Sequence, residues 1–189
     1  MKQQRARDKH LLLVYSAADL LLEQGWSALT HRALAARSGV PLASLTYYFD
    51  DVDDLLVQAA TELARRHLDA ARAVVAGVPR RRASAERTAA LVASVLVGDD
   101  PSPQDVRTLY ERYLRAGRTP ALHSLVIGWN TEVHGLVSDA LQRVGRPATP
   151  TQVRLLVAAF DGLLVSALAE GEPDPVASAT AVVTALVPG

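Results

Sequence analysis

A repeated way of starting a helix constrains this chain more than any other feature. Four times a residue that can cap a helix stands directly before proline: Ser102-Pro103, Thr119-Pro120, Thr149-Pro150 and Asp174-Pro175. The capping oxygen accepts a hydrogen bond from a backbone N–H of the first turn, and proline fits the first helical position because it has no N–H to leave unpaired. Glycines separate or close these segments: Gly98, Gly117, Gly145 and Gly171. The second half of the chain is therefore predicted to hold four helices.

The rest of the sequence also favours helices, because no alternation of apolar and polar residues predicts a strand. We expect an all-α protein with helices near residues 6–24, 30–37, 41–48, 51–76, 84–97, 103–116, 120–144, 150–170 and 175–187. The first three lie close together, and two of them are short. We therefore predict a small N-terminal domain over residues 1–50 and a larger helical domain over residues 51–189.

Composition limits the possible functions. The 189 residues suffice to bury a core, and the twenty basic residues are balanced by twenty acidic ones. A neutral chain does not attract polyanions as a whole, so any case for nucleic-acid binding must be local. Cysteine is absent, which excludes disulfides, thiolate metal sites and a cysteine nucleophile, and which fits a reducing cytosol.

Two apolar segments need a comparison with membrane and secretion signals. The start MKQQRARDKH followed by LLLVYSAADLLL is similar to a signal peptide, but Asp19 interrupts the apolar run and its apolar residues recur at helical spacing. The later stretch VRLLVAAFDGLLVSALA contains Arg154 and Asp161, which disfavour a membrane span. We expect a soluble, cytoplasmic protein.

The segment 30–48, THRALAARSGVPLASLTYY, has the pattern of a helix-turn-helix. Thr30 can cap a first helix, and Gly39 supplies a turn residue with positive φ. A second helix is then expected to open at Pro41 and to bury Leu45 and Phe49, which lie four residues apart on one face. The segment therefore predicts a DNA-binding motif.

The side chains left outside on the second helix are short or aromatic and carry no charge: Leu42, Ala43, Ser44, Thr46, Tyr47 and Tyr48. Ser44 can hydrogen-bond a base edge or a phosphate, and Leu42 and Ala43 can contact thymine methyl groups. Tyr47 and Tyr48 can donate to phosphates. The alternative is a structural helical corner in which the tyrosines are half-buried packing.

The charge for DNA binding would come from the flanks. Through residue 49 the chain holds six basic residues against three acidic ones, including a basic arm of Arg5, Arg7 and Lys9 that can follow the DNA backbone. Four aspartates follow at once, at positions 50, 51, 53 and 54, and they turn the formal charge through residue 54 to −1. They suit a helix N-terminus, with Asp51 as the cap and Asp54 reciprocating, but they weaken non-specific attraction to DNA.

The segments LLLVYSAADLLLEQGWSALTHRALAARSGV and PLASLTYYFDDVDDLL resemble the TetR family of bacterial transcription regulators. Members have a helix ending in Gly-aromatic, a Thr-started helix, a Gly-Val turn and a recognition helix ending in Leu-aromatic-x-aromatic-Phe. The resemblance implies a homodimer whose two recognition helices enter successive major grooves of a near-palindromic operator. We interpret the chain as a transcription regulator that acts as a repressor. It also implies a small-molecule effector in the larger domain that moves the helix starting near Asp51 and so releases the DNA.

Residue by residue, the resemblance implies phosphate contacts for Thr30 and Tyr48. It places five further residues near bases or adjacent phosphates: Arg32, Leu42, Ala43, Ser44 and Tyr47. The chain departs from the family at Thr46, where an aromatic residue is usual, and at Val52, where a lysine is usual. With the aspartates, these departures leave a second hypothesis open, which is a ligand- or protein-binding module of the same fold with weakened DNA binding.

The larger domain offers weaker signals. Tyr110, Tyr113 and Trp129 can line a pocket for an apolar or aromatic effector, with Asn130 orienting it, although such aromatics are often plain core. The sequence lacks Glu-x-x-His pairs, H-E-x-x-H, a Gly-x-Ser-x-Gly elbow, a phosphate loop and a dinucleotide fingerprint. We therefore expect no enzymatic activity, no cofactor and no metal site.

The helix predicted over 150–170 is apolar nearly all round, which a surface helix of a monomer does not tolerate. Its AAFDGLLVSAL segment resembles the Asp-Gly-Leu part of the TetR family's dimer-forming helix. With the last helix it would form a four-helix seam between two copies, and the alternative is a core helix of a monomer. The predicted interface residues are Phe160, Asp161, Leu164, Leu168, Val182 and Leu186.

Overall fold

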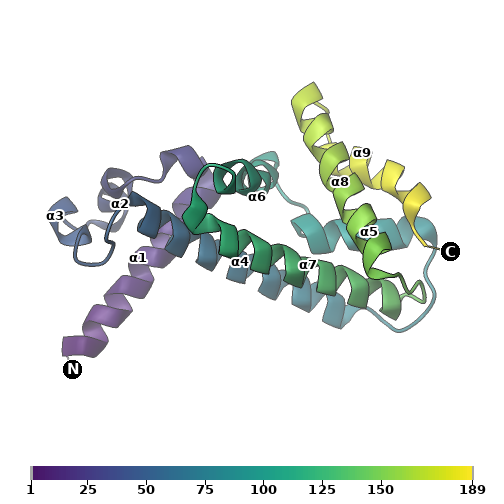
Figure 1. The fold of residues 1–189 in the computed structure, drawn as a ribbon, viewed down its shortest axis with the longest axis horizontal. Helices are drawn as coiled ribbons and strands as arrows, with labels where there is room; N and C mark the ends of the chain where they lie inside the picture. Colours follow the sequence, from purple (N-terminus) through teal and green to yellow (C-terminus); the bar gives the residue numbers. More distant parts are fainter. Residues whose placement is uncertain (1, 189) are drawn as a thin grey trace. The chain divides into compact units, whose positions relative to one another are not determined.

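The computed structural model describes residues 2–188, with side chains from residue 4 onward, and between these residues it contains helices and no β-strand (Figure 1). The nine α-helices are α1 (Lys2–Gln24), α2 (His31–Ser38), α3 (Leu42–Leu45), α4 (Val52–Gly77), α5 (Ala85–Val97), α6 (Pro103–Ala116), α7 (His123–Arg143), α8 (Pro150–Glu170) and α9 (Pro175–Val183). Short 3-10 helices are η1 (Trp26–Ala28), η2 (Pro120–Leu122) and η3 (Thr184–Leu186). The all-α prediction is confirmed.

Three of the four predicted caps start α-helices as expected. Ser102 and Thr149 accept hydrogen bonds from the backbone three residues on, at 3.1 and 3.3 Å, and Asp174 does so at 2.9 Å. The fourth is different, because the Thr119 side chain makes no cap hydrogen bond and Pro120 opens the 3-10 turn η2. Helix α7 therefore begins at His123 rather than at residue 120.

The first helix begins earlier than expected. It starts at Lys2, so Arg5, Arg7 and Lys9 lie on its first turns. The predicted basic arm is therefore part of α1, which begins four residues before the predicted start at residue 6. These basic side chains are exposed but fixed to a helical backbone.

The chain divides into two compact units. The first runs to Arg66 and adds Ser102–Gly128, and the second takes His67–Pro101 and the chain from Trp129 onward. Helices α4 and α7 contribute residues to both units.

The first unit is built around α1, which packs against α2 and α6. Trp26 lies in its core with 2% of its surface exposed, and its indole N–H donates to the carbonyl of Thr108 at 2.8 Å. The Thr108 hydroxyl in turn donates to the carbonyl of Leu21 at 3.2 Å. These buried hydrogen bonds fix the end of α1 on α6, because an unpaired indole or hydroxyl there would cost about 1–3 kcal/mol.

The second unit places α9 against both α8 and α5. Arg72 of α4 pairs with Glu132 of α7, and Arg143 at the end of α7 donates to the carbonyl of Val78 at 3.3 Å, so these parts of the two helices run side by side. By length and composition alone α8 could cross a membrane. One of its faces, including Phe160 with no exposed surface, is buried inside the unit.

Candidate DNA-binding site

The helix-turn-helix is present and is built by the residues that predict it. The Thr30 hydroxyl accepts from the backbone N–H of Ala33 at 3.1 Å and so caps α2. Gly39 has φ 68°, in the left-handed region, and its N–H closes the helix on the carbonyl of Ala35 at 3.0 Å. A residue with a Cβ is strained in that region, so glycine makes the turn at low cost.

Helix α3 is shorter than predicted, with one α-helical turn from Leu42 to Leu45. Tighter bonds then continue the turn, from the N–H of Tyr47 to the carbonyl of Ser44 and from the N–H of Tyr48 to that of Leu45. Leu45 and Phe49 are buried, at 0% and 1% exposure, which confirms the predicted inner face.

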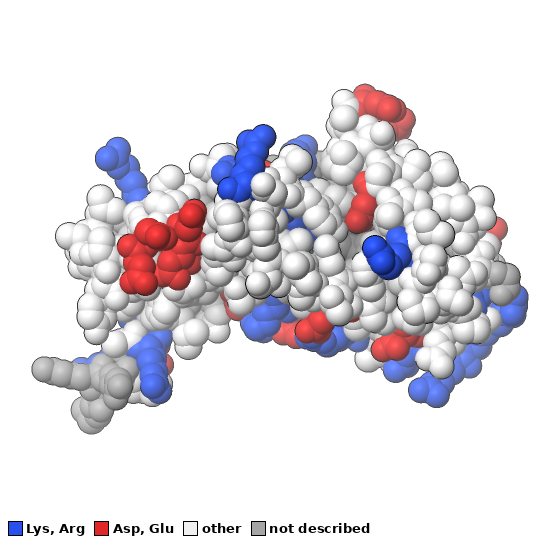
Figure 2. Space-filling view, in the orientation of Figure 1, with Lys and Arg blue, Asp and Glu red and all other residues white. Residues whose placement is uncertain are grey.

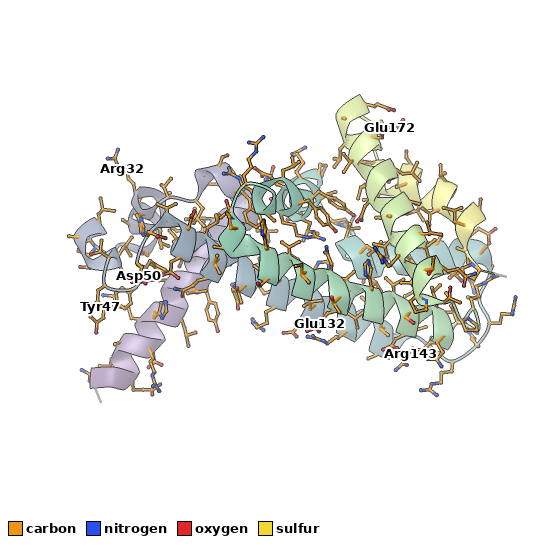
Figure 3. The ribbon with its side chains drawn as sticks, viewed as in Figure 1. Arg32, Tyr47, Asp50, Glu132, Arg143 and Glu172 are labelled. Carbon is orange, nitrogen blue, oxygen red and sulfur yellow. The ribbon has the colours of Figure 1, made fainter. Side chains whose placement is uncertain are left out.

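None of the eight predicted DNA-contacting residues is buried. Six are exposed, and Ser44 and Tyr48 are half-buried. Tyr47 is the most exposed of the large hydrophobic side chains described, with 78% of its surface exposed. Tyr48 is half-buried, with its ring stacked on His10 at 5.9 Å between centroids, and Tyr47 contacts it edge-on. In Figure 3 Tyr47 and Arg32 project in different directions from this part of the chain. Tyr48 thus supports Tyr47, which reaches furthest outward.

The aspartates at the start of α4 cap that helix. Asp51 accepts from the N–H of Asp54 at 2.8 Å, as predicted. Asp54 reciprocates one residue earlier than a standard capping box, accepting from the N–H of Asp50 at 3.0 Å. Figure 2 shows acidic side chains gathered where Figure 3 places Asp50. The negative charge is therefore structural and lies beside the recognition helix.

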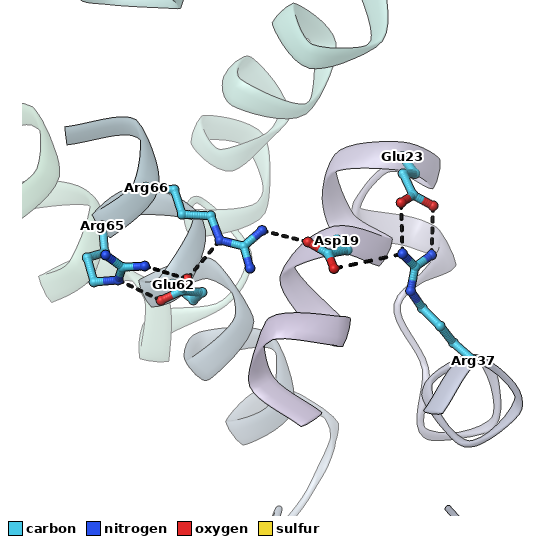
Figure 4. A network of polar contacts seen from close by, with 6 residues as sticks. All are labelled: Asp19, Glu23, Arg37, Glu62, Arg65 and Arg66. Atoms are coloured by element: carbon cyan, nitrogen blue, oxygen red, sulfur yellow. Dashed lines mark hydrogen bonds and ion pairs between the residues drawn. The ribbon is translucent and has the colours of Figure 1, made fainter. Parts of the chain in front are cut away.

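A network of ion pairs, which the sequence analysis did not predict, holds α2 on α1 (Figure 4). The Arg37 guanidinium donates two hydrogen bonds to Glu23, at 2.7 and 2.8 Å, and lies 3.8 Å from Asp19. The bidentate bond to Arg37 lowers the pKa of Glu23. A bidentate arginine–carboxylate pair of this kind fixes the relative orientation of the two side chains as well as stabilising their contact.

The same network continues onto α4 (Figure 4). Arg66 bridges Asp19 at 2.6 Å and Glu62 at 2.7 Å, and Arg65 also bonds Glu62 at 2.8 Å. Glu62 is buried, and the hydrogen bond from Arg65 is the main cause that lowers its pKa. The three helices α1, α2 and α4 are thus joined by charged groups within the first unit.

The residues predicted to bind an effector fall into both units. Tyr110 and Tyr113 lie on α6 in the first, where the Arg112 guanidinium sits 4.4 Å from the centre of the Tyr113 ring. Trp129 and Asn130 belong to the second, and Trp129 is buried with its ring 5.5 Å from that of His67.

The second unit has a hollow of about 510 Å³ between α4 and α5, next to this aromatic pair. His67 lines it together with small and apolar residues of both helices, and the residues just after α5 complete the wall with a carboxylate: Ala70, Ala71, Ala73, Val74, Ser94, Val95, Gly98 and Asp99. Its volume is within the range typical of small-molecule sites. No local pattern in the sequence predicts this hollow, because α4 and α5 are brought together only by tertiary packing.

Burial corrects part of the predicted dimer interface. Phe160 and Leu164 are fully buried inside the second unit, so neither has surface for a partner. Leu168 and Asp161 are half-buried, whereas Val182 and Leu186 are more than half exposed. The outward face of α8 carries a different stripe, spaced three and four residues apart: Leu155, Ala158, Gly162, Val165 and Ala169.

Within the described residues, no group of three or more His, Asp or Glu side chains is arranged to hold a metal ion.

The chain matches two family models. The model described as "Bacterial regulatory proteins, tetR family" matches residues 13–59, and the one described as "Tetracyclin repressor-like, C-terminal domain" matches residues 83–189. The first covers the helix-turn-helix, and the second covers more than half of the chain.

Solved structures and curated relatives agree with these matches. The multidrug binding protein EbrR has been solved with imidazole, with proflavin and with ethidium. The chain in the imidazole complex is 30% identical in sequence to this chain, with 96% of each chain covered and a TM-score of 0.71. A TetR family member from Streptomyces coelicolor, SCO1917, is 29% identical over 97% of this chain and 99% of its own, with a TM-score of 0.64. The HTH-type transcriptional regulator Rv2912c of Mycobacterium tuberculosis is 24% identical over 170 residues, which are 87% of this chain and 85% of the relative. The chain therefore belongs to the TetR family of bacterial regulatory proteins and is a transcription regulator.

Proposed function

We propose that this regulator is a cytoplasmic repressor that binds a near-palindromic operator as a homodimer and leaves it when a small molecule binds. The observation that carries the proposal is the exposed, uncharged surface of α3, held by a capped α2 and by the Gly39 turn. Residues 1–50 act as the reading domain and residues 51–189 as the effector and dimer domain. The chain has no enzymatic role in this account.

In the proposed complex α3 enters the major groove. Ser44 and Tyr47 hydrogen-bond base edges or nearby phosphates, and Leu42 and Ala43 contact thymine methyl groups. Thr46 donates to the carbonyl of Ala43 at 3.0 Å and contributes mainly shape. At the edges of the groove, phosphates are contacted by Thr30, Arg32 and Tyr48.

The proposed dimer forms through the outward faces of α8 and α9. Ala158 and Gly162 lie on the exposed stripe of α8 and let a second helix approach closely. Leu155 and Val165, at 64% and 49% exposure, supply apolar area on the same stripe, and α9 with η3 adds Val182 and Leu186. Exposed apolar residues in such a continuous stripe are typical of interfaces.

The proposed effector site is the hollow beside His67 and Trp129. It is supported by its mainly small and apolar lining, to which Asp99 adds a carboxylate, and by the ring contact of His67 with Trp129. The complexes of the relative EbrR with proflavin and with ethidium make aromatic compounds the first effectors to try. An effector that prefers the DNA-incompetent conformation of α4 lowers operator affinity by its differential binding free energy.

The experiment is gel-shift binding of the purified protein to the DNA flanking its own gene, repeated over a range of salt concentrations. Selective binding whose log affinity falls steeply with log salt supports the repressor. Weak binding to every duplex, even at low salt, would instead favour a ligand- or protein-binding module in which the aspartates at 50–54 have removed useful DNA affinity.

A further inference from the structure

The most basic surface described in the second unit is a cluster of arginines around the loop between α4 and α5 and the end of α7. It consists of six residues, here called the arginine cluster: Arg80, Arg81, Arg82, Arg87, Arg143 and Arg146. Figure 2 shows basic side chains gathered where Figure 3 labels Arg143. Within the described residues none of the six forms an ion pair, and with Glu86 and Asp139 as neighbouring carboxylates the six arginines leave a formal charge of +4. This charge is concentrated in a chain that is neutral overall.

The two loops that carry the cluster are tied to each other. The N–H of Ala83 donates to the carbonyl of Val144 at 3.1 Å, and Arg82 donates to the carbonyl of Gly145 at 3.2 Å. Gly145 has φ 70°, and a Cβ added there would lie 3.3 Å from the Cα of Arg82, so glycine permits this close approach. Arg146 and Arg143 add hydrogen bonds to the carbonyls of Ala83 and Val78. The loops are therefore organised, and most guanidinium N–H groups remain available for a ligand.

The cluster borders two adjoining hollows. One, of about 460 Å³, is lined by Arg80, Arg81, Arg82 and Arg143 with Asp139, Gln142 and Gly145. The other, of about 550 Å³, shares Arg81 and Arg82 and adds Arg87 and Ser84, and apolar residues form the rest of its wall: Val78, Pro79, Ala83, Leu91 and Val144. A multiply charged group fits the first, and an apolar group attached to it fits the second.

We propose that the arginine cluster binds a small oligophosphate anion, such as a nucleoside triphosphate. The guanidiniums hold the phosphates in the first hollow, since their planar forks match phosphate oxygens, and the apolar hollow receives the nucleoside. A small ligand fits better than a DNA backbone because the arginines converge on hollows of limited volume. The site would let the regulator respond to a phosphorylated metabolite.

The test measures binding of sodium tripolyphosphate and of ATP to the whole protein by isothermal titration calorimetry at about 0.15 M salt, where weak surface attraction is screened. Arg80→Gln/Arg81→Gln is the variant, because neither side chain makes a hydrogen bond among the described residues. We expect saturable binding to the wild type and a loss of about tenfold or more in the variant, since two guanidiniums that make charge-assisted hydrogen bonds to phosphate are removed.

Arg107→Gln/Arg118→Gln is the matched control, with the same change in charge outside the cluster, and it is expected to bind like the wild type. Equal weakening in both double variants, or no saturable binding to the wild type, would overturn the proposal. Loss of affinity for a random-sequence duplex in Arg80→Gln/Arg81→Gln, with no tripolyphosphate binding by the wild type, would assign the cluster to the DNA backbone instead. Tighter binding of ATP than of tripolyphosphate supports the role of the apolar hollow, and equal affinities would remove that part.

Discussion

The residue Gly39 sets the angle at which α3 follows α2. Its φ of 68° turns the chain between α2 and α3, and no atom lies within 4 Å of a Cβ added there. A side chain at this position therefore meets only the backbone strain of the left-handed region, without a clash. The loss of stability on replacing Gly39 therefore measures the backbone strain of the turn alone.

We predict that Gly39→Ala lowers the free energy of unfolding by about 1–2 kcal/mol because an L-residue is strained in the left-handed region. The same substitution at Gly128, inside α7 and also without a neighbour within 4 Å, is expected to raise it by about 0.5–1 kcal/mol, because alanine favours a helix. Urea unfolding followed by circular dichroism measures both. Effects of the same sign would contradict this assignment of the turn.

A substitution at Asp53 measures how much the acidic start of α4 lowers the affinity for DNA. It lies beside Asp51 and Asp54 but takes no part in their capping hydrogen bonds. Asp53→Asn is expected to raise affinity for random-sequence duplex about twofold at low salt, because one repulsive charge near the phosphates is removed. Fluorescence anisotropy with labelled duplex measures this. The exposed Glu170→Gln is the charge-matched control, and an equal rise in both variants would show that the position of the charge does not matter.

At the scale of helices, the ion pairs among α1, α2 and α4 include one buried carboxylate, that of Glu62. Arg65 and then Arg66 hold the pKa of Glu62 below its ordinary value near 4.5. The folded protein therefore keeps this group ionised where the unfolded chain would protonate it. The resulting stabilisation is complete above pH 4.5 and is lost as the pH falls through the lower value of the folded state.

We predict that Glu62→Gln lowers the free energy of unfolding by about 2 kcal/mol at pH 7, in line with hydrogen bonds to charged groups. The difference between wild type and variant should shrink below pH 4.5. Urea unfolding at pH 7, 4 and 3 gives the comparison, with the exposed Glu170→Gln expected within about 0.5 kcal/mol of the wild type throughout. A difference that does not change with pH would mean that packing, and not charge, accounts for the loss.

Local patterns in the sequence were sufficient to predict most of the helices. Caps such as Ser102 and Thr149, the Gly39 turn and the buried pair Leu45 and Phe49 depend on neighbours within a few residues, and each is confirmed. Thr119 is the exception. The Thr-Pro pair here opens a 3-10 turn, and the same pair of residue types can also start an α-helix, so the sequence does not tell the two apart.

Features that depend on contacts between distant segments could not be predicted in this way. The pairing of Arg37 with Glu23 needs the crossing of α2 over α1, which no local pattern specifies. Which face of α8 is inner was also undetermined, since the helix is apolar nearly all round. Phe160 and Leu164 were therefore assigned to a partner although they fill the core of the second unit.

For the whole molecule, the proposal requires two copies of the chain. We predict that Val165→Glu converts a dimer with a mass of twice 20.2 kDa into a monomer, because a charge on the exposed stripe of α8 would be buried unpaired at the seam. Light scattering coupled to size-exclusion chromatography measures the mass. Leu114→Glu, at a residue 71% exposed on α6, should remain dimeric. A Val165→Glu variant with the mass of the wild type would place the seam elsewhere.

The charge of the whole chain also distinguishes this regulator from a protein that binds DNA by net attraction. Its formal charge is zero, and the segment through residue 54 is slightly acidic. We therefore expect contacts made by α3 to add substantially to the salt-dependent phosphate contacts, so that the removal of one α3 contact weakens operator binding measurably.

The most direct test of the central claim is operator binding by Tyr47→Ala, measured by fluorescence anisotropy on a duplex selected by the wild-type protein. Tyr47 is exposed and outside the core, so we predict an unchanged melting temperature and an affinity about tenfold lower, which corresponds to the loss of roughly 1.4 kcal/mol of contact. Leu114→Ala, at a residue 71% exposed on α6, should bind like the wild type. If Tyr47→Ala binds the operator as tightly as Leu114→Ala does, α3 does not read DNA through this surface and the account is wrong.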